Sequence, residues 1–403
     1  MSRFRTPMAG LAGLALLFLG AAVPAAADPT ERAEDLAVVT LLNINDFHGR
    51  IASAPDSDSG ANTLSLAAVI DRLRQSAGPA NAVLLSAGDN VGASLFASAV
   101  QDDQPTLDVL NTLGLAASAV GNHEFDRGWD DLSGRLEEAA DFPYLGANVY
   151  AKGTKNPALQ EFAVVEAAGL RVAVIGAVTQ ETPTLVSPAG VAAIDFGDPV
   201  EAVNRVADRI KAENLADIIV AEYHDGAPAG SPEGATLEQE IAVSATFAHI
   251  VEDTAASVDV IFTAHTHKAY AWEAAVPGTD KTRPVLQTGC YGANLGVVSL
   301  SYDKTAGTVV SHSQTNVKAA ATEPDPNDPA AQLPVPTEAE TAASPTLTRV
   351  KAIVDAAMAN AQAVGSQKVG AVTADITRAA AGGTYSADGV YSGGALDDRA
   401  EAS

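Results

Sequence analysis

Residues 37–48, AVVTLLNINDFH, join an apolar run to a carboxylate and an imidazole two positions apart. The run is rich in β-branched residues and is typical of a β-strand. Five of the seven histidines in the chain follow strand-like runs in this way or belong to motifs that do. The motifs are Asp46-Phe47-His48, Gly88-Asp89-Asn90 after NAVLLSA, Gly121-Asn122-His123-Glu124 after AASAV, His224 after ADIIVAEY, and His265-Thr266-His267 after VDVIFTA. This layout predicts a metal centre where strands end.

Strand-like and helical patterns alternate from residue 37 to about residue 312. The helical patterns cover residues 62–75, 107–113, 130–140, 199–213 and 237–253. Several strand-like runs, such as VAVIGAV and DIIVAEY, are largely apolar, which favours strands buried on both faces. The alternation predicts a layered α/β domain. Open α/β sheets bind ligands outside the carboxyl ends of their strands, which is where the polar motifs lie.

The ordered motifs NINDFHGR, SAGDN, GNHEFD, YHDG and AHTH resemble those of one enzyme family. They are similar to the secreted 5′-nucleotidase branch of the calcineurin-like metallophosphoesterases, over roughly residues 38–303. The resemblance implies a four-layer α/β/β/α sandwich with a two-metal centre at the strand ends. We therefore expect an α/β metallophosphoesterase domain over residues 37–318.

Two neighbouring divalent ions need a shared anionic bridge and neutral or anionic ligands on either side. Residues two apart on a strand share a face, which predicts that Asp46 and His48 serve one ion. The resemblance makes Asp89 the bridge, assigns the second ion to Asn122, His224 and His265, and returns His267 to the first. Imidazole and carboxylate ligands suit Zn, Mn, Fe or Co better than Ca, and the choice among these four stays open.

The catalytic and substrate-binding roles also come from the resemblance. It implies that His123 stabilises the phosphoryl transition state or protonates the leaving group, that Asp126 orients His123, and that Asn122 and His123 contact the substrate. A carboxylate near His123 would raise its pKa and fix its tautomer. For Glu124, Asn90 and Asn45 we expect hydrogen bonds to turns around the site. The remaining singled-out residues, His249, His312 and Cys290, are interpreted as packing or surface residues.

The N-terminal residues have the composition of a secretory signal peptide. Arg3 and Arg5 precede the apolar residues 9–23, and Ala25-Ala26-Ala27 form a small-residue cleavage site. The apolar run is short for a membrane anchor, so we expect residues 1–27 to be removed, the mature chain to lie outside the cell or in its envelope, and no stable membrane insertion. With one cysteine, Cys290, the chain has no intrachain disulfide.

The formal net charge of −26 becomes −28 when Arg3 and Arg5 are removed with the signal. Such a surface repels nucleic-acid polymers. The negative charge does not exclude a small phosphorylated substrate such as a nucleotide, because metal ions bound at the site would neutralise the charge of the phosphate.

The C-terminal part changes in composition. Residues 319–346 are rich in Pro, Glu and Asp and predict a mobile linker or long surface loop. Residues 347–403 are expected to hold a linker helix, from about 347 to 364, and the incomplete start of a C-terminal 5′-nucleotidase domain. In the family that domain carries the nucleobase pocket.

The leading hypothesis is a secreted nucleotide phosphohydrolase. A 2′,3′-cyclic phosphodiesterase, a UDP-sugar hydrolase or a thiosulfate-type hydrolase would use a similar centre. A metal-stabilised binding protein without turnover is the alternative from another class, and no G-x-S-x-G motif supports a non-metal hydrolase.

Overall fold

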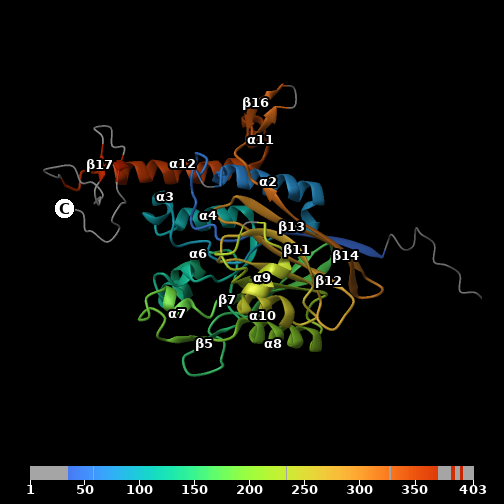
Figure 1. Cartoon of the computed structure of the whole chain (residues 1–403). Coiled ribbons are helices and arrows are strands. Elements are labelled where there is room, and N and C mark those ends of the chain that lie inside the picture. Colours follow the sequence, from blue (N-terminus) through green and yellow to red (C-terminus); the bar gives the residue numbers. More distant parts are fainter. Residues whose placement is uncertain are drawn as a thin grey trace, which may run out of the picture.

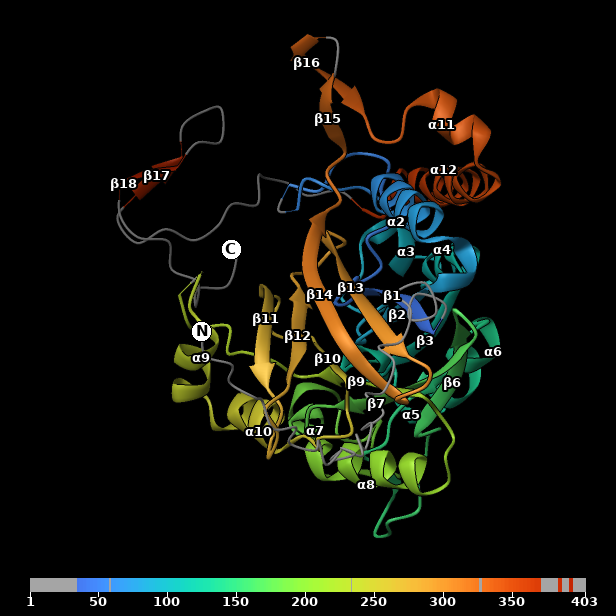
Figure 2. The same cartoon turned by 90° about the vertical axis from the view of Figure 1, so that its right-hand side faces the viewer.

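The computed structural model describes residues 35–57, 59–232, 234–325, 328–370, 383–385 and 391–393. The predicted signal peptide, residues 1–27, lies outside the described residues, as does most of the KVGAVTADI run. None of the described helices is long and apolar enough to cross a membrane. Two six-stranded sheets lie at the centre of the molecule, with helices outside them (Figures 1 and 2).

The first sheet has the strand order β14-β13-β1-β2-β3-β4. Its strands β1 to β4 are parallel, and β13 and β14 continue the sheet in antiparallel register. The bounds are β1 Leu36–Ile44, β2 Ala82–Ser86, β3 Leu115–Ala119, β4 Tyr144–Leu145, β13 Asn294–Asp303 and β14 Thr308–Lys318.

The second sheet has the strand order β11-β12-β10-β9-β7-β6. The four inner strands are parallel, and both edge strands, β6 and β11, are antiparallel to their neighbours. The bounds are β6 Phe162–Ala167, β7 Leu170–Val178, β9 Ile218–His224, β10 Val260–Thr263, β11 Ala269–Ala275 and β12 Thr282–Thr288.

Three apolar cores separate four layers. The central core lies between the two sheets and contains Leu41, Val174 and Phe262. The core beyond the first sheet is closed by α2 (Thr63–Ala77), α4 (Gln104–Leu113) and α12 (Pro345–Gly365), and the core beyond the second by α8 (Pro199–Ala212) and α10 (Ala245–Asp253). The order helix, sheet, sheet, helix confirms the predicted α/β/β/α sandwich.

The shorter elements connect these layers. They are η1 Pro79–Asn81, α3 Phe96–Ala99, η2 His123–Phe125, α5 Trp129–Asp131, η3 Leu132–Leu136, α6 Glu137–Ala139, β5 Val149–Ala151, α7 Thr182–Leu185, β8 Ile194–Phe196, α9 Leu237–Val243, β15 Thr322–Asp325, β16 Asp328–Pro334, α11 Glu338–Ala343, β17 Gly383–Tyr385 and β18 Tyr391–Gly393.

The segment expected to be a linker contains regular structure. Strands β15 and β16 form a hairpin, and α11 follows it. Arg72 of α2 pairs with Glu323 of the hairpin at 3.1 Å and with Glu340 of α11 at 2.6 Å. The next helix, α12, covers the predicted residues 347–364 and buries Val350 and Val354 in the core against the first sheet. This helix is therefore part of the packed sandwich.

Candidate metal centre

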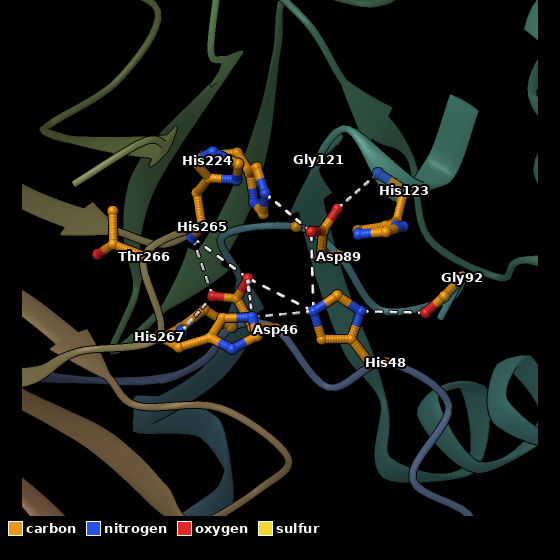
Figure 3. Close-up of polar contacts among 12 residues, drawn as sticks. Asp46, His48, Asp89, Gly92, Gly121, His123, His224, His265, Thr266 and His267 are labelled. Carbon is orange, nitrogen blue, oxygen red and sulfur yellow. Dashed lines mark hydrogen bonds and ion pairs between the residues drawn. The ribbon is translucent and has the colours of Figure 1, made fainter. Parts of the chain in front are cut away.

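The structure brings together six of the seven predicted metal ligands and His123, and the seventh, Asn122, directly precedes His123 on the same loop. Asp46, Asp89 and Asn122 lie on the loops that follow β1, β2 and β3, while His224 ends β9 and His265 follows β10. These strands are parallel within each sheet, so their carboxyl ends meet at one edge of the sandwich. Figure 3 shows the resulting cluster, with Asp46 and Asp89 between the imidazoles.

Asp46, His48 and His267 form the first ligand cluster. The Nε2 atoms of His48 and His267 lie 3.1 Å apart. They lie 3.7 and 3.4 Å, respectively, from Oδ1 of Asp46. Two imidazole nitrogens and one carboxylate oxygen therefore lie close enough together to bind the same ion, and divalent transition metals prefer ligands of these types.

Asp89, His224 and His265 form the second ligand cluster. Oδ2 of Asp89 lies 3.0 Å from Nε2 of His224 and 3.8 Å from Nε2 of His48, which belongs to the first cluster. Asp89 is thus the carboxylate within reach of both clusters. It is itself almost fully buried, with an exposed fraction of 1%.

Two buried side-chain atoms of the predicted second ligand set lack a hydrogen-bond partner, as expected for metal ligands. Oδ1 of Asn122 makes no hydrogen bond, and neither does Nε2 of His224 despite its short distance to Asp89. The other ring nitrogen of His224, Nδ1, lies 2.8 Å from the carbonyl oxygen of Ala87. When the ring of His224 is neutral, a proton on Nδ1 donates to that carbonyl and leaves the Nε2 lone pair facing the cluster. A cation between these atoms would satisfy both, so the residues fit a metal.

The pKa values show how strongly the buried carboxylates attract positive charge. Burial lowers the pKa of His224, but Asp89, Asp46 and the Ala87 carbonyl together raise that pKa to about 10. Burial likewise opposes the effect of Asp46 on His267, whose pKa rises to about 10. His265 differs: burial and repulsion from His224 lower its pKa to about 4.

The ligand loops have an unusual backbone. Five of the ligands adopt positive φ angles between 48° and 71°, a region that residues other than glycine rarely occupy; they are Asp46, His48, Asp89, His265 and His267. Hydrogen bonds hold these loops, including Asp46 N to Gly88 O at 3.0 Å and His265 N to Oδ2 of Asp46 at 3.0 Å. Such conformations concentrate at functional sites.

These angles correct one part of the sequence argument. Asp46 and His48 do meet at one cluster, but β1 ends at Ile44, so strand alternation is not the reason. Tight turns place Asp46 and His48 together, and a tight turn after β10 likewise carries His265 and His267, one to each cluster.

Glu124 ties two ligand loops together. Its carboxylate accepts hydrogen bonds from the backbone N–H groups of Asp89 at 2.9 Å, Asn90 at 2.8 Å and Gly121 at 2.6 Å. Asn45 has a similar role, because its side chain contacts Oδ2 of Asp46 at 2.7 Å and the Gly289 carbonyl at 2.6 Å. The prediction that these residues form hydrogen bonds around the site is confirmed.

His123 lies beside the metal ligands with its ring nitrogen Nδ1 2.9 Å from Oδ2 of Asp126. Its backbone N–H donates to Oδ1 of Asp89 at 2.8 Å. The hydrogen bond with Asp126 raises the pKa of His123 above its ordinary value. A Cβ on Gly92 would come within 2.6 Å of Asp126 and 2.7 Å of His123, so only glycine leaves room for this pair.

Sequence reasoning missed Gly92, Tyr291 and Arg50. The Tyr291 ring centre lies 5.4 Å from that of His267 and 5.8 Å from that of His48, and the guanidinium of Arg50 stacks 3.5 Å above the Tyr291 ring. The glycines flanking this turn are visible in QTGCYGANLG, but nothing in that run marks the tyrosine as a neighbour of the histidines. The other two histidines, His249 and His312, belong to neither ligand cluster.

The model of one protein family matches residues 39–269, which is 231 of the 403 residues and includes every ligand described above. That family is the calcineurin-like phosphoesterases. The chain belongs to this family.

The chain is similar to two curated relatives and to one solved structure. Endonuclease YhcR of Bacillus subtilis is 30% identical over 292 residues, covering 68% of this chain and 23% of that protein. The 5′-nucleotidase of Vibrio cholerae is 29% identical over 261 residues, covering 63% and 45%. The crystal structure of a 5′-nucleotidase precursor from Thermus thermophilus superposes with a TM-score of 0.61 at 20% identity, covering 84% of this chain and 62% of that one. The chain spans less than half the length of these two curated relatives.

Proposed function

We propose that the chain is a secreted phosphohydrolase that removes phosphate from nucleotides with the help of two divalent ions. The observation that carries the proposal is the position of Asp89, whose carboxylate contacts ligands of both clusters. A single shared carboxylate between two sets of imidazole ligands is the arrangement that a two-metal centre requires. Family membership and the resemblance to 5′-nucleotidases support the same reading.

Two divalent ions, when bound, supply the Lewis acidity that makes water a nucleophile near neutral pH and neutralises the phosphoryl oxygens. In our proposal Asp46, His48 and His267 would hold one ion, Asn122, His224 and His265 would hold the other, and Asp89 would be available to both. The ions would be Zn, Mn, Fe or Co.

His123 supplies the proton for the leaving group. The carboxylate of Asp126 accepts a hydrogen bond from Nδ1–H and fixes the ring, which leaves the Nε2 proton free to point at the substrate. The raised pKa favours the doubly protonated form that can donate this proton. Asn122 and His123, on one loop, would also contact the phosphoryl group.

Measurement of hydrolysis by the metal-stripped and reconstituted protein tests the proposal. We expect no turnover of p-nitrophenyl phosphate or AMP after chelation, and recovery with one or more of Zn, Mn, Fe and Co. A protein that binds two ions and stays inert to both esters would instead be a metal-stabilised binding protein. Export is tested separately by mass spectrometry, for which we expect a mature N-terminus at Asp28.

A further inference from the structure

The loop that follows β10 supplies one ligand to each cluster. We call residues 264–268 the β10 ligand loop; in it Thr266 separates His265 from His267. The two histidines have φ angles of 71° and 61°, which residues other than glycine rarely adopt. Such conformations persist only when the surrounding structure holds them. The contacts at the two ends of this loop therefore determine where the two imidazoles lie.

Backbone hydrogen bonds hold the first half of the β10 ligand loop. The N–H of Ala264 donates to the carbonyl oxygen of Asp225 at 3.1 Å. The N–H of His265 donates to Oδ2 of Asp46 at 3.0 Å, as Figure 3 shows. Asp225 directly follows His224, the buried ligand at the end of β9. The position of His265 is thus tied to other parts of the metal centre.

A buried ion pair holds the second half of the loop. The ammonium group of Lys268 contacts the carboxylate of Glu240 in α9 and the hydroxyl group of Ser231. The side chain of Lys268 is 7% exposed and that of Glu240 is fully buried. Lysine is rarely buried unless it is paired. The carbonyl oxygen of Lys268 also accepts from the N–H of Gly289 at 2.8 Å, so both its side chain and its backbone are anchored.

His267 needs this anchor more than His48 or His224 does. Its side chain is 37% exposed, whereas those of His48 and His224 are 3% and 0% exposed. An exposed side chain has fewer neighbours that restrict its rotation. His267 directly precedes Lys268, so the ion pair fixes the backbone from which this imidazole projects.

We propose that the buried pair of Lys268 and Glu240 positions His267 and thereby raises the affinity of the first cluster for its ion. This inference rests on the proposed function, because it requires that the first cluster binds an ion. Lys268 is a positioning residue that acts through the backbone it shares with His267. The ion of the second cluster should be nearly independent of the pair, since separate hydrogen bonds hold His265.

The sign of the effect of Lys268→Met separates positioning from charge. The substitution removes a positive charge near two cation sites, so electrostatics alone would strengthen metal binding. Loss of positioning would weaken it, because a freer imidazole must be ordered when the ion binds. We expect the first ion to bind about tenfold more weakly, the lower end of the range for losing a group that orients a ligand. Titration of the metal-free protein against a competing chelator measures both affinities.

A double-mutant cycle tests whether Lys268 acts through His267. His267→Ala removes the ligand and identifies which of the two measured affinities belongs to the first cluster. Adding Lys268→Met to His267→Ala should weaken that ion by less than about twofold more, because the imidazole that Lys268 positions is already gone. A merely structural role would instead weaken both ions and would add to the effect of His267→Ala.

Two further variants control for stability. Breaking a buried ion pair is strongly destabilising, but replacing both partners with apolar side chains is often neutral. Lys268→Met/Glu240→Leu therefore carries the same test should Lys268→Met not fold, and it should also weaken the first ion, since neither new side chain makes a directional bond. Arg283→Met is the matched control. Arg283 is also a buried cation, but it lies at the amino end of β12, and its guanidinium donates to backbone carbonyl oxygens, including that of Thr254. Its loss should lower the thermal stability of the metal-free protein without changing either affinity.

The outcomes distinguish this inference from the proposed function. A wild-type chain that binds no divalent ion would refute the proposed function. A chain that binds two ions would overturn the positioning role alone if loss of the pair left the first affinity unchanged, strengthened it, or weakened both affinities equally. Additive effects in the cycle with His267→Ala would overturn it as well.

Discussion

The two ligand clusters share similar chemistry but differ in exposure. In the second cluster His224 is fully buried and is fixed through Nδ1 by the Ala87 carbonyl. In the first cluster the side chain of His267 is 37% exposed and borders the partly exposed Tyr291. A buried, oriented ligand loses little freedom on binding a metal, whereas an exposed imidazole must be ordered and desolvated. The second cluster should therefore hold its ion more tightly, and the first should exchange its ion more readily.

Asp89→Asn should produce the largest effect, because it removes the charge that both clusters share. We expect loss of measurable turnover and a fall in bound metal to one ion or none, measured by elemental analysis. Asp126→Asn is the matched control, since it makes the same substitution near His123 but removes no ligand. Two ions retained at normal affinity with normal rates would contradict the assignment of Asp89 to both clusters.

His123→Ala should lower kcat by about 10²–10⁴-fold while leaving both ions in place, as expected for loss of an acid group. Asp126→Ala should act in the same direction but less. Because these variants should change the rate but not the metal content, they separate the role of the proton donor from the difference in metal affinity between the clusters. Loss of an ion from His123→Ala would show that His123, which lies near both His48 and Asp89, is itself a ligand.

A direct comparison of His224→Ala with His267→Ala tests the difference in exposure. We expect His224→Ala to weaken the ion of the second cluster by at least about tenfold more than His267→Ala weakens that of the first, because the buried site cannot replace its ligand with water as easily. Titration against a competing chelator measures both affinities. If the two variants lost metal affinity equally, the difference in burial would not explain a difference in affinity between the clusters.

Much of the fold and the site was predictable from the sequence because the signals are local. Apolar strand-like runs predicted a layered α/β domain, and the polar motifs at their ends contain every residue of the two clusters. The two-sheet sandwich and the division of the ligands between two ions came from the family resemblance. Helix boundaries were less accurate. Residues 237–253 were expected to form one helix, but Ser244 adopts an extended conformation and its side chain caps a second helix by accepting from the N–H of Phe247.

What the sequence could not show depends on contacts between distant segments. Val350 and Val354 have the spacing of any amphipathic helix, and only the structure places that helix against α2 and α4. Likewise Arg72 and Glu340 are 268 positions apart, so no local pattern links them. The pairing of Tyr291 with Arg50 and the room that Gly92 leaves for Asp126 are of the same kind.

Tyr291→Ala should produce the smallest effect and sharpen the comparison further. The ring borders His48 and His267 of the first cluster only, so its loss should admit water there and weaken that ion by about three- to tenfold, less than the 10–100-fold typical of losing a hydrogen-bonded partner of a ligand. The ion of the second cluster should be unchanged. Tyr291→Phe keeps the ring and should behave as wild type. Val350→Ala, in the remote core of α12, controls for general destabilisation: it should cost about 2 kcal/mol of unfolding free energy without changing either affinity. If Tyr291→Ala weakens both ions equally, the two clusters respond as one unit, and exposure does not distinguish them.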